Sequence, residues 1–279
     1  IAIIANFIAP SNIPFPCGRL EYIQPTQACR LNTPSAVFRA GWTKTISALH
    51  FQQPEARMCG RFTQTYTWAE IHAMYNLTAV TPRNIQPRYN IAPTTQVGVI
   101  TQKDGALYYS EMRWWLVPNW WSKDLKSVPA TFNARSEEIA SKPMFRSAFK
   151  STRCLIPASG FFEWTGPKEA RQPWFISAKD GKPLTFAGLH ETWRDRTTGE
   201  EVKSCTIITC AANDFMAKIH TRMPVILDEK DWHLWLSEPR EDLLKPANDD
   251  VLQAWRVSPQ VNNSRYTGDD TMEPITPME

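Results

Sequence analysis

The chain has 279 residues, of which 42% are hydrophobic, 11% aromatic and 21% charged, and its formal net charge is +3. This composition is that of a globular protein and excludes a disordered, collagen-like or coiled-coil chain. Pro, Asn, Ser or charged residues interrupt every apolar run, so the sequence predicts no membrane span and a soluble protein.

Residues 1–57 differ in composition from the rest of the chain. They contain six of the 22 prolines and show no sustained helical or strand periodicity. Five basic and two acidic residues lie here, so this segment carries the whole net charge and 58–279 is neutral. Three interpretations of this segment are open: a transit peptide, a signal segment and an upstream extension of the reading frame. We favour the third, with 1–57 a poorly structured leader absent from the mature protein and 58–279 its catalytic domain.

The remaining sequence predicts short strands and a few short helices. A helix is predicted over 68–76, because Thr67 can act as N-cap with Glu70 three residues later. Apolar runs bounded by turn residues predict strands at 97–101, 107–115, 154–157, 161–164, 174–177, 184–189, 205–209 and 252–257. Further short helices are expected at 145–150, 214–219 and 228–236, and a loose tail from about residue 262. These elements predict an α+β fold, a single domain with a mostly antiparallel, barrel-like β-sheet core.

The cysteines give no sign of a metal site. They are Cys17, Cys29, Cys59, Cys154, Cys205 and Cys210. No pair has the two-residue spacing of zinc ligands, so we expect neither a metal nor a cofactor. Without a secretory signal, we expect a reducing cytoplasm and free thiols.

The segment Met58-Cys59-Gly60-Arg61-Phe62 offers a candidate reactive group. Removal of Met58 would leave Cys59 with a free amine beside its thiol. The amine can condense with an aldehyde to an imine, and the thiolate can close onto the imine carbon to give a thiazolidine. A small buried structural cysteine is the alternative interpretation of this motif.

Three further residues are candidates for acid–base or positioning roles. Glu163 lies in the aromatic run 161–164, and desolvation there would raise the pKa of the carboxyl and suit it to proton transfer. A Glu at an exposed strand edge is the alternative. His220 and Asn133 are candidates as well, although a structural His and a turn or cap Asn explain each residue taken alone.

The segment 113–121 contains four Trp residues. Indole faces stack on unpaired bases, and the nearby Arg113, Lys123 and Lys126 can meet phosphates. Core packing is the alternative.

Seven segments, in this order, resemble the SOS response-associated peptidase family, whose members process abasic sites and cross-link to damaged DNA. They are 58–62, 88–94, 114–120, 133–137, 154–164, 186–189 and 220–224. The resemblance implies a β-rich α+β domain that binds single-stranded DNA containing an abasic site. It places the family's terminal cysteine on Cys59, its asparagine on Asn133, its glutamate on Glu163 and its histidine on His220.

The same resemblance implies a set of DNA-binding residues. These are Asn90, Trp114, Trp120, Arg135 and Arg222. The two Trp residues are expected to contact bases, and the others to line the site or meet phosphates. Trp115 stands where the family usually has Gly, and His190 where Trp is common, which leaves the stacking geometry near them open.

We therefore expect an enzyme that senses abasic sites and forms a covalent thiazolidine through Cys59. In this hypothesis Glu163 shuttles protons, Asn133 holds the amine and His220 handles protons on the sugar oxygen. The resemblance also implies two further activities, which are removal of the leader by peptidase activity and a lyase step. We expect a monomer that lies in the cytoplasm, associated with the nucleoid if the source is bacterial. Its expected partner is single-stranded DNA that contains abasic sites, and we expect no association with a membrane.

Two alternatives from other classes remain open. The first is a cysteine peptidase acting on proteins, with Cys59 as nucleophile, His220 as base and Asn133 as orienter. The second is a module that binds single-stranded DNA without a covalent step by stacking bases on Trp114 and Trp120.

Overall fold

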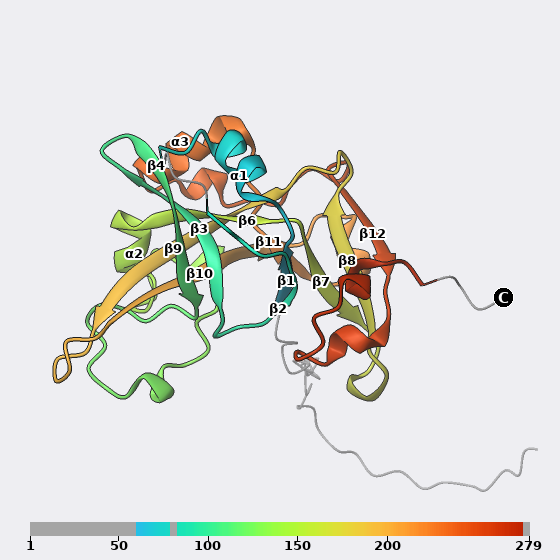
Figure 1. Cartoon of the computed structure of the whole chain (residues 1–279), viewed down its shortest axis with the longest axis horizontal. Helices are drawn as coiled ribbons and strands as arrows, with labels where there is room; N and C mark the ends of the chain where they lie inside the picture. The colour runs from blue at the N-terminus through green and yellow to red at the C-terminus, as the bar shows by residue number, and fades with distance from the viewer. Residues whose placement is uncertain (1–59, 79–82, 276–279) are drawn as a thin grey trace, which may run out of the picture. The chain divides into compact units, whose positions relative to one another are not determined.

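The computed structural model describes residues 60–78 and 83–275, so the hypotheses for Cys59 and the leader lie outside the described residues. All the described residues belong to one compact unit (Figure 1). Its secondary structure is dominated by short strands, as the sequence predicts.

Five strands of the larger sheet close into a barrel. They are β3 (Gln96–Lys103), β4 (Ala106–Trp114), β6 (Arg153–Ala158), β9 (Leu184–Arg194) and β10 (Glu201–Ala211). The path β10-β4-β3-β6-β9 closes because β9 also pairs with β10. Two short strands, β5 (Asn133–Arg135) and β11 (Arg222–Pro224), pair with β10 as well. Only the pairings of β10 with β4 and β5 are parallel among the described strands, so the expected mostly antiparallel barrel is confirmed.

A second, antiparallel sheet packs against the barrel. Its order is β12 (Leu252–Arg256), β8 (Gln172–Ala178), β7 (Gly160–Thr165), β1 (Arg61–Gln64) and β2 (Arg88–Ile91). Aromatic side chains join the two sheets: Phe62 of β1 meets Trp114 of β4 edge to face at 4.9 Å between ring centroids. Phe161 of β7 likewise meets Phe186 of β9. These contacts bury Phe62 of β1 in the core, whereas Arg61 before it is half-buried.

Three α-helices of the described residues cover the barrel. They are α1 (Trp68–Tyr75), α2 (Arg146–Ser151) and α3 (Glu229–Ser237). At the start of α1, the backbone N–H of Glu70 donates to Thr67 Oγ1 and the Thr67 N–H donates to Glu70 Oε2, which confirms the predicted cap. α2 packs on β6 and β9, and α3 packs on β3 and β6 (Figure 1). No helix among the described residues is long and apolar enough to cross a bilayer.

Short 3₁₀ segments complete the fold. They are η1 (Leu125–Ser127), η2 (Ser136–Glu138), η3 (Lys168–Ala170), η4 (Met216–Lys218), η5 (Glu241–Leu243), η6 (Pro259–Asn262) and η7 (Asp269–Met272). The helix expected over 214–219 is therefore the single turn η4.

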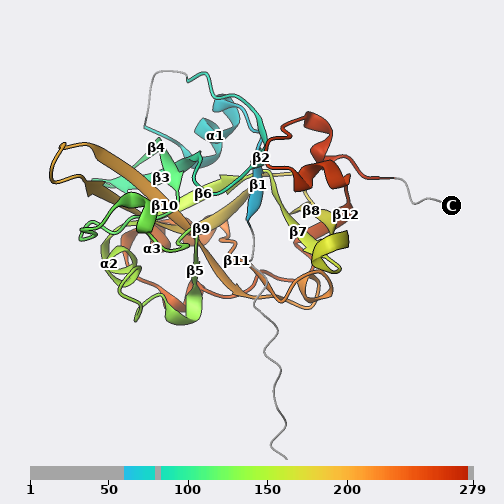
Figure 2. The same cartoon turned by 90° about the horizontal axis from the view of Figure 1, so that it is seen from below.

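The tail expected to be loose from about residue 262 is packed against the domain as far as residue 275. We call residues 259–275 the C-terminal strap; Figure 2 shows it in red beside β2. Thr271 is fully buried and its Oγ1 donates to the carbonyl of Tyr89, while Pro274 forms a bridge to Val257. The expectation of a loose tail is wrong because hydrogen bonds, rather than a periodic apolar face, hold this polar segment.

Candidate active site and nucleic-acid interface

A pocket of about 460 Å³ opens beside Gly60, the residue that follows Cys59. The described residues that line it are Gly60, Arg61, Pro93, Trp115, Phe132, Trp164, Lys168, Arg171 and Asn262. Three of these side chains are aromatic, three are cationic and none is acidic. Aromatic faces stack on unpaired bases and cations bind phosphates, so this lining suits a single nucleic-acid strand.

Strand β1 brings the start of the described chain to Glu163. In the antiparallel pair of β1 with β7, Arg61 lies opposite Phe162, and one further step of the register places Gly60 level with Glu163. Glu163 is only 2% exposed. Because side chains alternate along a strand, the Glu163 side chain shares the face of buried Phe161, and Trp164 takes the other face at the pocket.

The motifs around Asn133 and His220 meet on β10. Asn133 begins β5 and pairs with Ile207, while Arg222 of β11 pairs with Ala211 of the same strand. The Arg222 guanidinium donates to both carboxylate oxygens of Glu137 at 2.9 Å, and this contact ties the two motifs together. The hydrogen bonds from Arg222 hold the pKa of Glu137 below its usual range. Glu137 thus offsets the charge of Arg222, and their ion pair links the two motifs. A phosphate contact by Arg222 stays a prediction.

His220 lies between η4 and β11. Its Nδ1 accepts a hydrogen bond from the backbone N–H of Arg222 at 3.2 Å. Burial lowers the pKa of His220, and the charges of Arg222 and Arg171 lower it further. Since Arg171 lines the pocket, His220 lies within electrostatic reach of it.

Each of the three described catalytic candidates is linked to a pocket residue, two by adjacency in the sequence and one by electrostatic influence. Glu163 precedes Trp164, Asn133 follows Phe132, and His220 is influenced by Arg171. Glu163 lies on β7 of the second sheet, whereas Asn133 and His220 lie at or next to β5 and β11, which pair with β10.

Trp114 is a core residue, and the expectation that it contacts bases is wrong. It is fully buried, and its Nε1 donates to the carbonyl of Phe132 at 2.8 Å. No face of the ring is left for a base. Its neighbour Trp115 lines the pocket instead, with its ring tilted against Phe132. Trp120 is 45% exposed but is not among the described residues that line the pocket.

Asn90 anchors the C-terminal strap rather than facing a ligand, contrary to the expectation that it lines the site. Its side chain is buried, and its Nδ2 donates to the carbonyls of Asn263 and Tyr266 at 3.1 and 2.7 Å. Its Oδ1 accepts from Arg61 Nη1 at 2.8 Å. Asn90 therefore acts on the pocket through Arg61. Arg135 is half-buried at the end of β5, and its role stays a prediction.

Several pocket residues were not assigned a role from the sequence. They are Arg61, Pro93, Phe132, Trp164, Lys168, Arg171 and Asn262. The sequence does contain one feature that could have indicated some of them. Trp164 directly follows Glu163 in a predicted strand, and the basic residues Lys168 and Arg171 come shortly after it. Asn262 carried no such signal, because it reaches the pocket from the far end of the chain.

The thiols of the described residues are unsuited to nucleophilic chemistry. Cys154, Cys205 and Cys210 are free and buried, and burial raises the pKa of each, that of Cys210 to about 12. Within 60–78 and 83–275, no group of three or more His, Cys, Asp or Glu side chains is placed to hold a metal ion.

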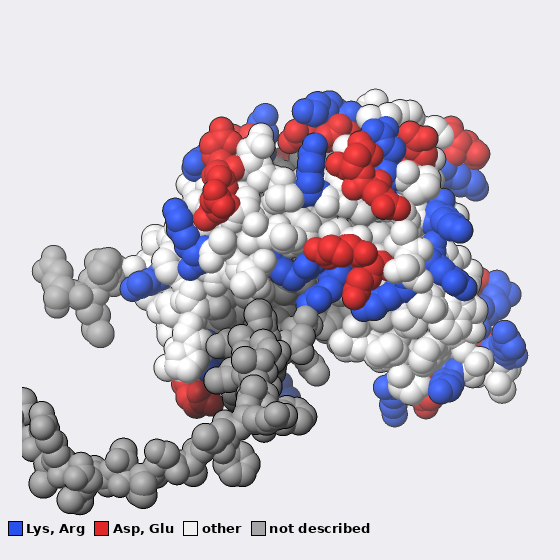
Figure 3. All heavy atoms as spheres, turned by 180° about the vertical axis from the view of Figure 1, so that it is seen from behind, with Lys and Arg blue, Asp and Glu red and all other residues white. Residues whose placement is uncertain are grey.

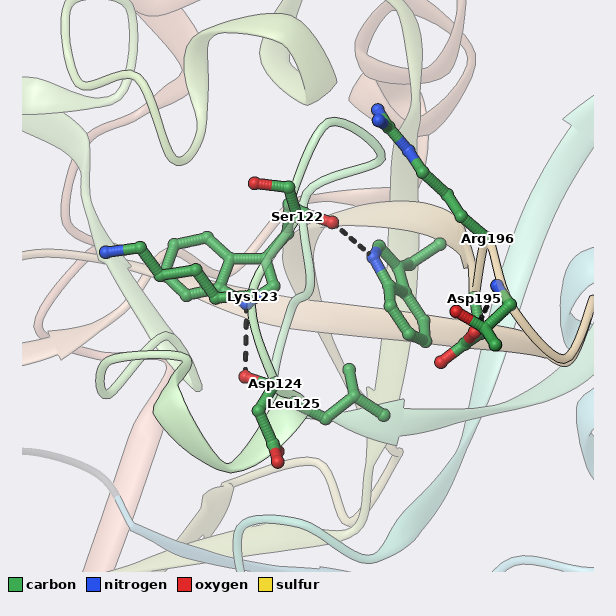
Figure 4. Close-up of a pocket in the computed structure, with 9 residues that line it drawn as sticks. Ser122, Lys123, Asp124, Leu125, Asp195 and Arg196 are labelled. Atoms are coloured by element: carbon green, nitrogen blue, oxygen red, sulfur yellow. Dashed lines mark hydrogen bonds between the residues drawn. The ribbon is translucent and has the colours of Figure 1, made fainter.

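A second pocket, of about 330 Å³, lies between residues 121–125 and 193–197 (Figure 4). The Trp193 Nε1 donates to the carbonyl of Trp121 at 2.7 Å and holds the two segments together. Its lining includes acidic Asp124 and Asp195 as well as Lys123 and Arg196, but none of the predicted catalytic residues. Acidic and basic side chains also intermingle on the face of Figure 3, in agreement with the neutral charge of 58–279.

Comparison with known proteins assigns the chain to a family. A sequence model of the SOS response associated peptidase (SRAP) family matches residues 58–264. The chain belongs to this family.

Named relatives agree with this assignment, and a solved structure shares the fold. The chain is 36% identical to the abasic site processing protein YoqW of Bacillus subtilis over 225 residues, covering 77% of this chain and 99% of YoqW. It is 31% identical to the abasic site processing protein YedK of Escherichia coli, covering 78% and 100% of the two chains. A crystal structure of a Bacteroides thetaiotaomicron protein shares the fold with a TM-score of 0.71 at 24% identity, covering 78% of this chain and all of that one.

Proposed function

We propose that this chain captures abasic sites in single-stranded DNA by forming a thiazolidine through a terminal Cys59. The pocket beside Gly60 carries the proposal, because its aromatic and cationic lining without an acidic residue suits a strand with unpaired bases. The names of the relatives, abasic site processing proteins, support the same substrate.

The proposed reaction releases only water. The α-amine of Cys59 adds to the C1′ aldehyde of the ring-opened abasic sugar, and loss of one water gives an imine. The thiolate then adds to the imine carbon, and the nitrogen takes up a proton. One C–N and one C–S bond join the protein to the sugar in the closed ring.

Three side chains assist these steps in the proposal. Glu163, which is shielded from solvent, moves protons during ring opening and imine formation. Asn133 hydrogen-bonds the amine. Because Nδ1 of His220 accepts from the Arg222 N–H, the neutral ring carries its proton on Nε2, from which it can donate to the sugar oxygen.

A peptidase that uses the same residues is the rival function, and the printed family description names peptidases. In that role the Cys59 thiol attacks a peptide carbonyl and needs no free amine. Removal of residues 1–58 by this site, and strand scission by a lyase step, are further activities that we propose for the family's chemistry here.

The decisive experiment compares the full chain with a chain that begins at Met58. Each is mixed with single-stranded DNA bearing one abasic site, and covalent adducts are resolved on a denaturing gel after intact-mass analysis of the termini. We expect adducts only from protein whose terminus is Cys59. Acetylation of that amine should abolish them, with the Cys59→Ser variant as a control that retains the amine. Adducts from acetylated protein would contradict the proposal and favour the peptidase-type thiol chemistry.

A further inference from the structure

The C-terminal strap contributes one side chain to the pocket, Asn262. Its Oδ1 accepts a hydrogen bond of 2.6 Å from the indole Nε1 of Trp164. The two residues are 98 positions apart in the sequence, and both line the pocket beside Gly60. The Asn262 side chain therefore hydrogen-bonds the strap to the aromatic wall of the pocket.

The backbone around Asn262 is fixed by bonds that do not involve its side chain. Arg61 Nη1 donates to the carbonyl of Val261 at 2.8 Å, and Arg61 Nη2 donates to that of Asn262 at 3.4 Å. Asn90 holds the carbonyls of Asn263 and Tyr266. Val261 is buried against the Phe162 cluster. Loss of the Asn262 side chain should thus leave the strap in place.

Trp164 is held on one side and open on the other. It packs against a small cluster of Phe162, Phe175, Val257 and Val261, while it also lines the pocket. A hydrogen bond at Nε1 restricts rotation of the ring about its χ angles. With its N–H engaged by Asn262, the indole offers a base its face, and stacking on a face does not discriminate among bases.

We propose that Asn262 is a positioning residue that holds the Trp164 indole as a stacking platform for one base of the bound strand. This inference rests on the proposed function and adds to it the residue that orders the strand-binding wall. Asn262 touches Trp164 and not the reacting atoms, so it acts on strand affinity, without preference for base sequence. The terminal amine and thiol play no part in this step.

The test uses the full chain and a short fluorescein-labelled single-stranded oligonucleotide that has no abasic site, so only non-covalent binding is measured. Fluorescence anisotropy gives Kd for the native chain, Asn262→Ala, Trp164→Phe and the double variant. Gln260→Ala is the matched control, because it removes another exposed amide side chain from η6. Thermal unfolding of each variant shows whether the fold is kept.

We expect Asn262→Ala to raise Kd about 5-fold, the equivalent of one hydrogen bond, while Gln260→Ala leaves it unchanged. In the Trp164→Phe background, Asn262→Ala should have no additional effect, because the indole N–H through which it acts is gone. The slope of log Kd against log salt should stay the same, since no phosphate contact is removed.

An unchanged Kd for Asn262→Ala, or losses that multiply in the double variant, would overturn the inference and leave the proposed function standing. Failure of the native chain to bind the oligonucleotide would overturn both. Trp164→Phe removes the same hydrogen bond from its donor side, so it tests that bond even if Asn262→Ala proves unstable.

Discussion

The backbone N–H of Arg222 donates to Nδ1 of His220 at 3.2 Å. This bond sets the tautomer of the neutral ring, because an Nδ1 that accepts leaves the proton on Nε2. The donor lies two residues along the chain, at the start of β11, whose pairing with β10 fixes its direction. The fold therefore presents His220 as a neutral hydrogen-bond donor.

We expect His220 to titrate below pH 6.5, the ordinary midpoint for the side chain. Burial disfavours the imidazolium, and the nearby Arg222 and Arg171 charges disfavour it further. Nuclear magnetic resonance of the imidazole carbon-bound protons as a function of pH measures this midpoint, with the signal assigned from the His220→Gln variant. Arg171→Gln should move the midpoint upward. A His220 midpoint at or above 6.5 contradicts the expected neutral donor.

Glu163→Gln should slow thiazolidine formation by about 10² to 10⁴-fold, the usual contribution of a general acid–base group. The amide keeps the shape of the carboxyl but cannot exchange a proton. Single-turnover time courses on denaturing gels give the rate constant. Glu191→Gln is the matched control, because it changes another buried strand glutamate, one on β9 rather than level with Gly60. Equal rates for both variants would remove Glu163 from the mechanism.

We expect Glu191 to make the stability of the fold depend on pH. It is 6% exposed on β9, and burial raises the pKa of its carboxyl from 4.5 to about 7. Between these values the folded protein binds a proton that the unfolded chain has lost, so stability falls as pH rises through this window. Glu191→Gln should match the native chain near pH 4 and exceed it by about 3 kcal/mol near pH 8 in urea unfolding. A difference that is the same at both pH values would refute this.

Substitutions of the adjacent residues Trp114 and Trp115 should change different quantities, namely the stability of the fold and the affinity for DNA. Trp114→Ala removes a fully buried ring and should lower the free energy of unfolding by about 3 to 5 kcal/mol. Trp115→Ala removes a pocket-lining ring and should instead raise Kd for single-stranded DNA about 5- to 100-fold. Urea unfolding and anisotropy on both variants measure the two effects. The reverse assignment would restore Trp114 as the base contact.

The sequence predicted the long strands and missed the short ones for a physical reason. The core strands β3, β4, β9 and β10 bury apolar runs, and their patterns were visible. Strands β1, β2, β5 and β11 have four residues or fewer and carry polar motif residues. Asn133, for which a turn or cap was the alternative interpretation, begins β5, because pairing with β10 overrides its weak local preference.

The candidate site was predictable as motifs but not as a surface. Glu163, Asn133 and His220 were selected from the sequence. Trp114 and Trp115 are adjacent in the chain, and the sequence did not show which of the two is buried in the core. Asn90 looked like a site residue because it lies in a motif, yet its hydrogen bonds to the strap are contacts between distant segments. Such contacts leave no periodic signal in either segment.

The central claim is that one residue supplies both the nitrogen and the sulfur of the covalent link. Tandem mass spectrometry of the proteolysed adduct tests it most directly. The account predicts a DNA-bearing peptide that begins at Cys59 and whose mass equals the sum of the peptide and the abasic-site DNA fragment minus one water. Its fragments should place the sugar on that residue alone. A DNA-bearing peptide in which Cys59 is still joined to Met58 would contradict it.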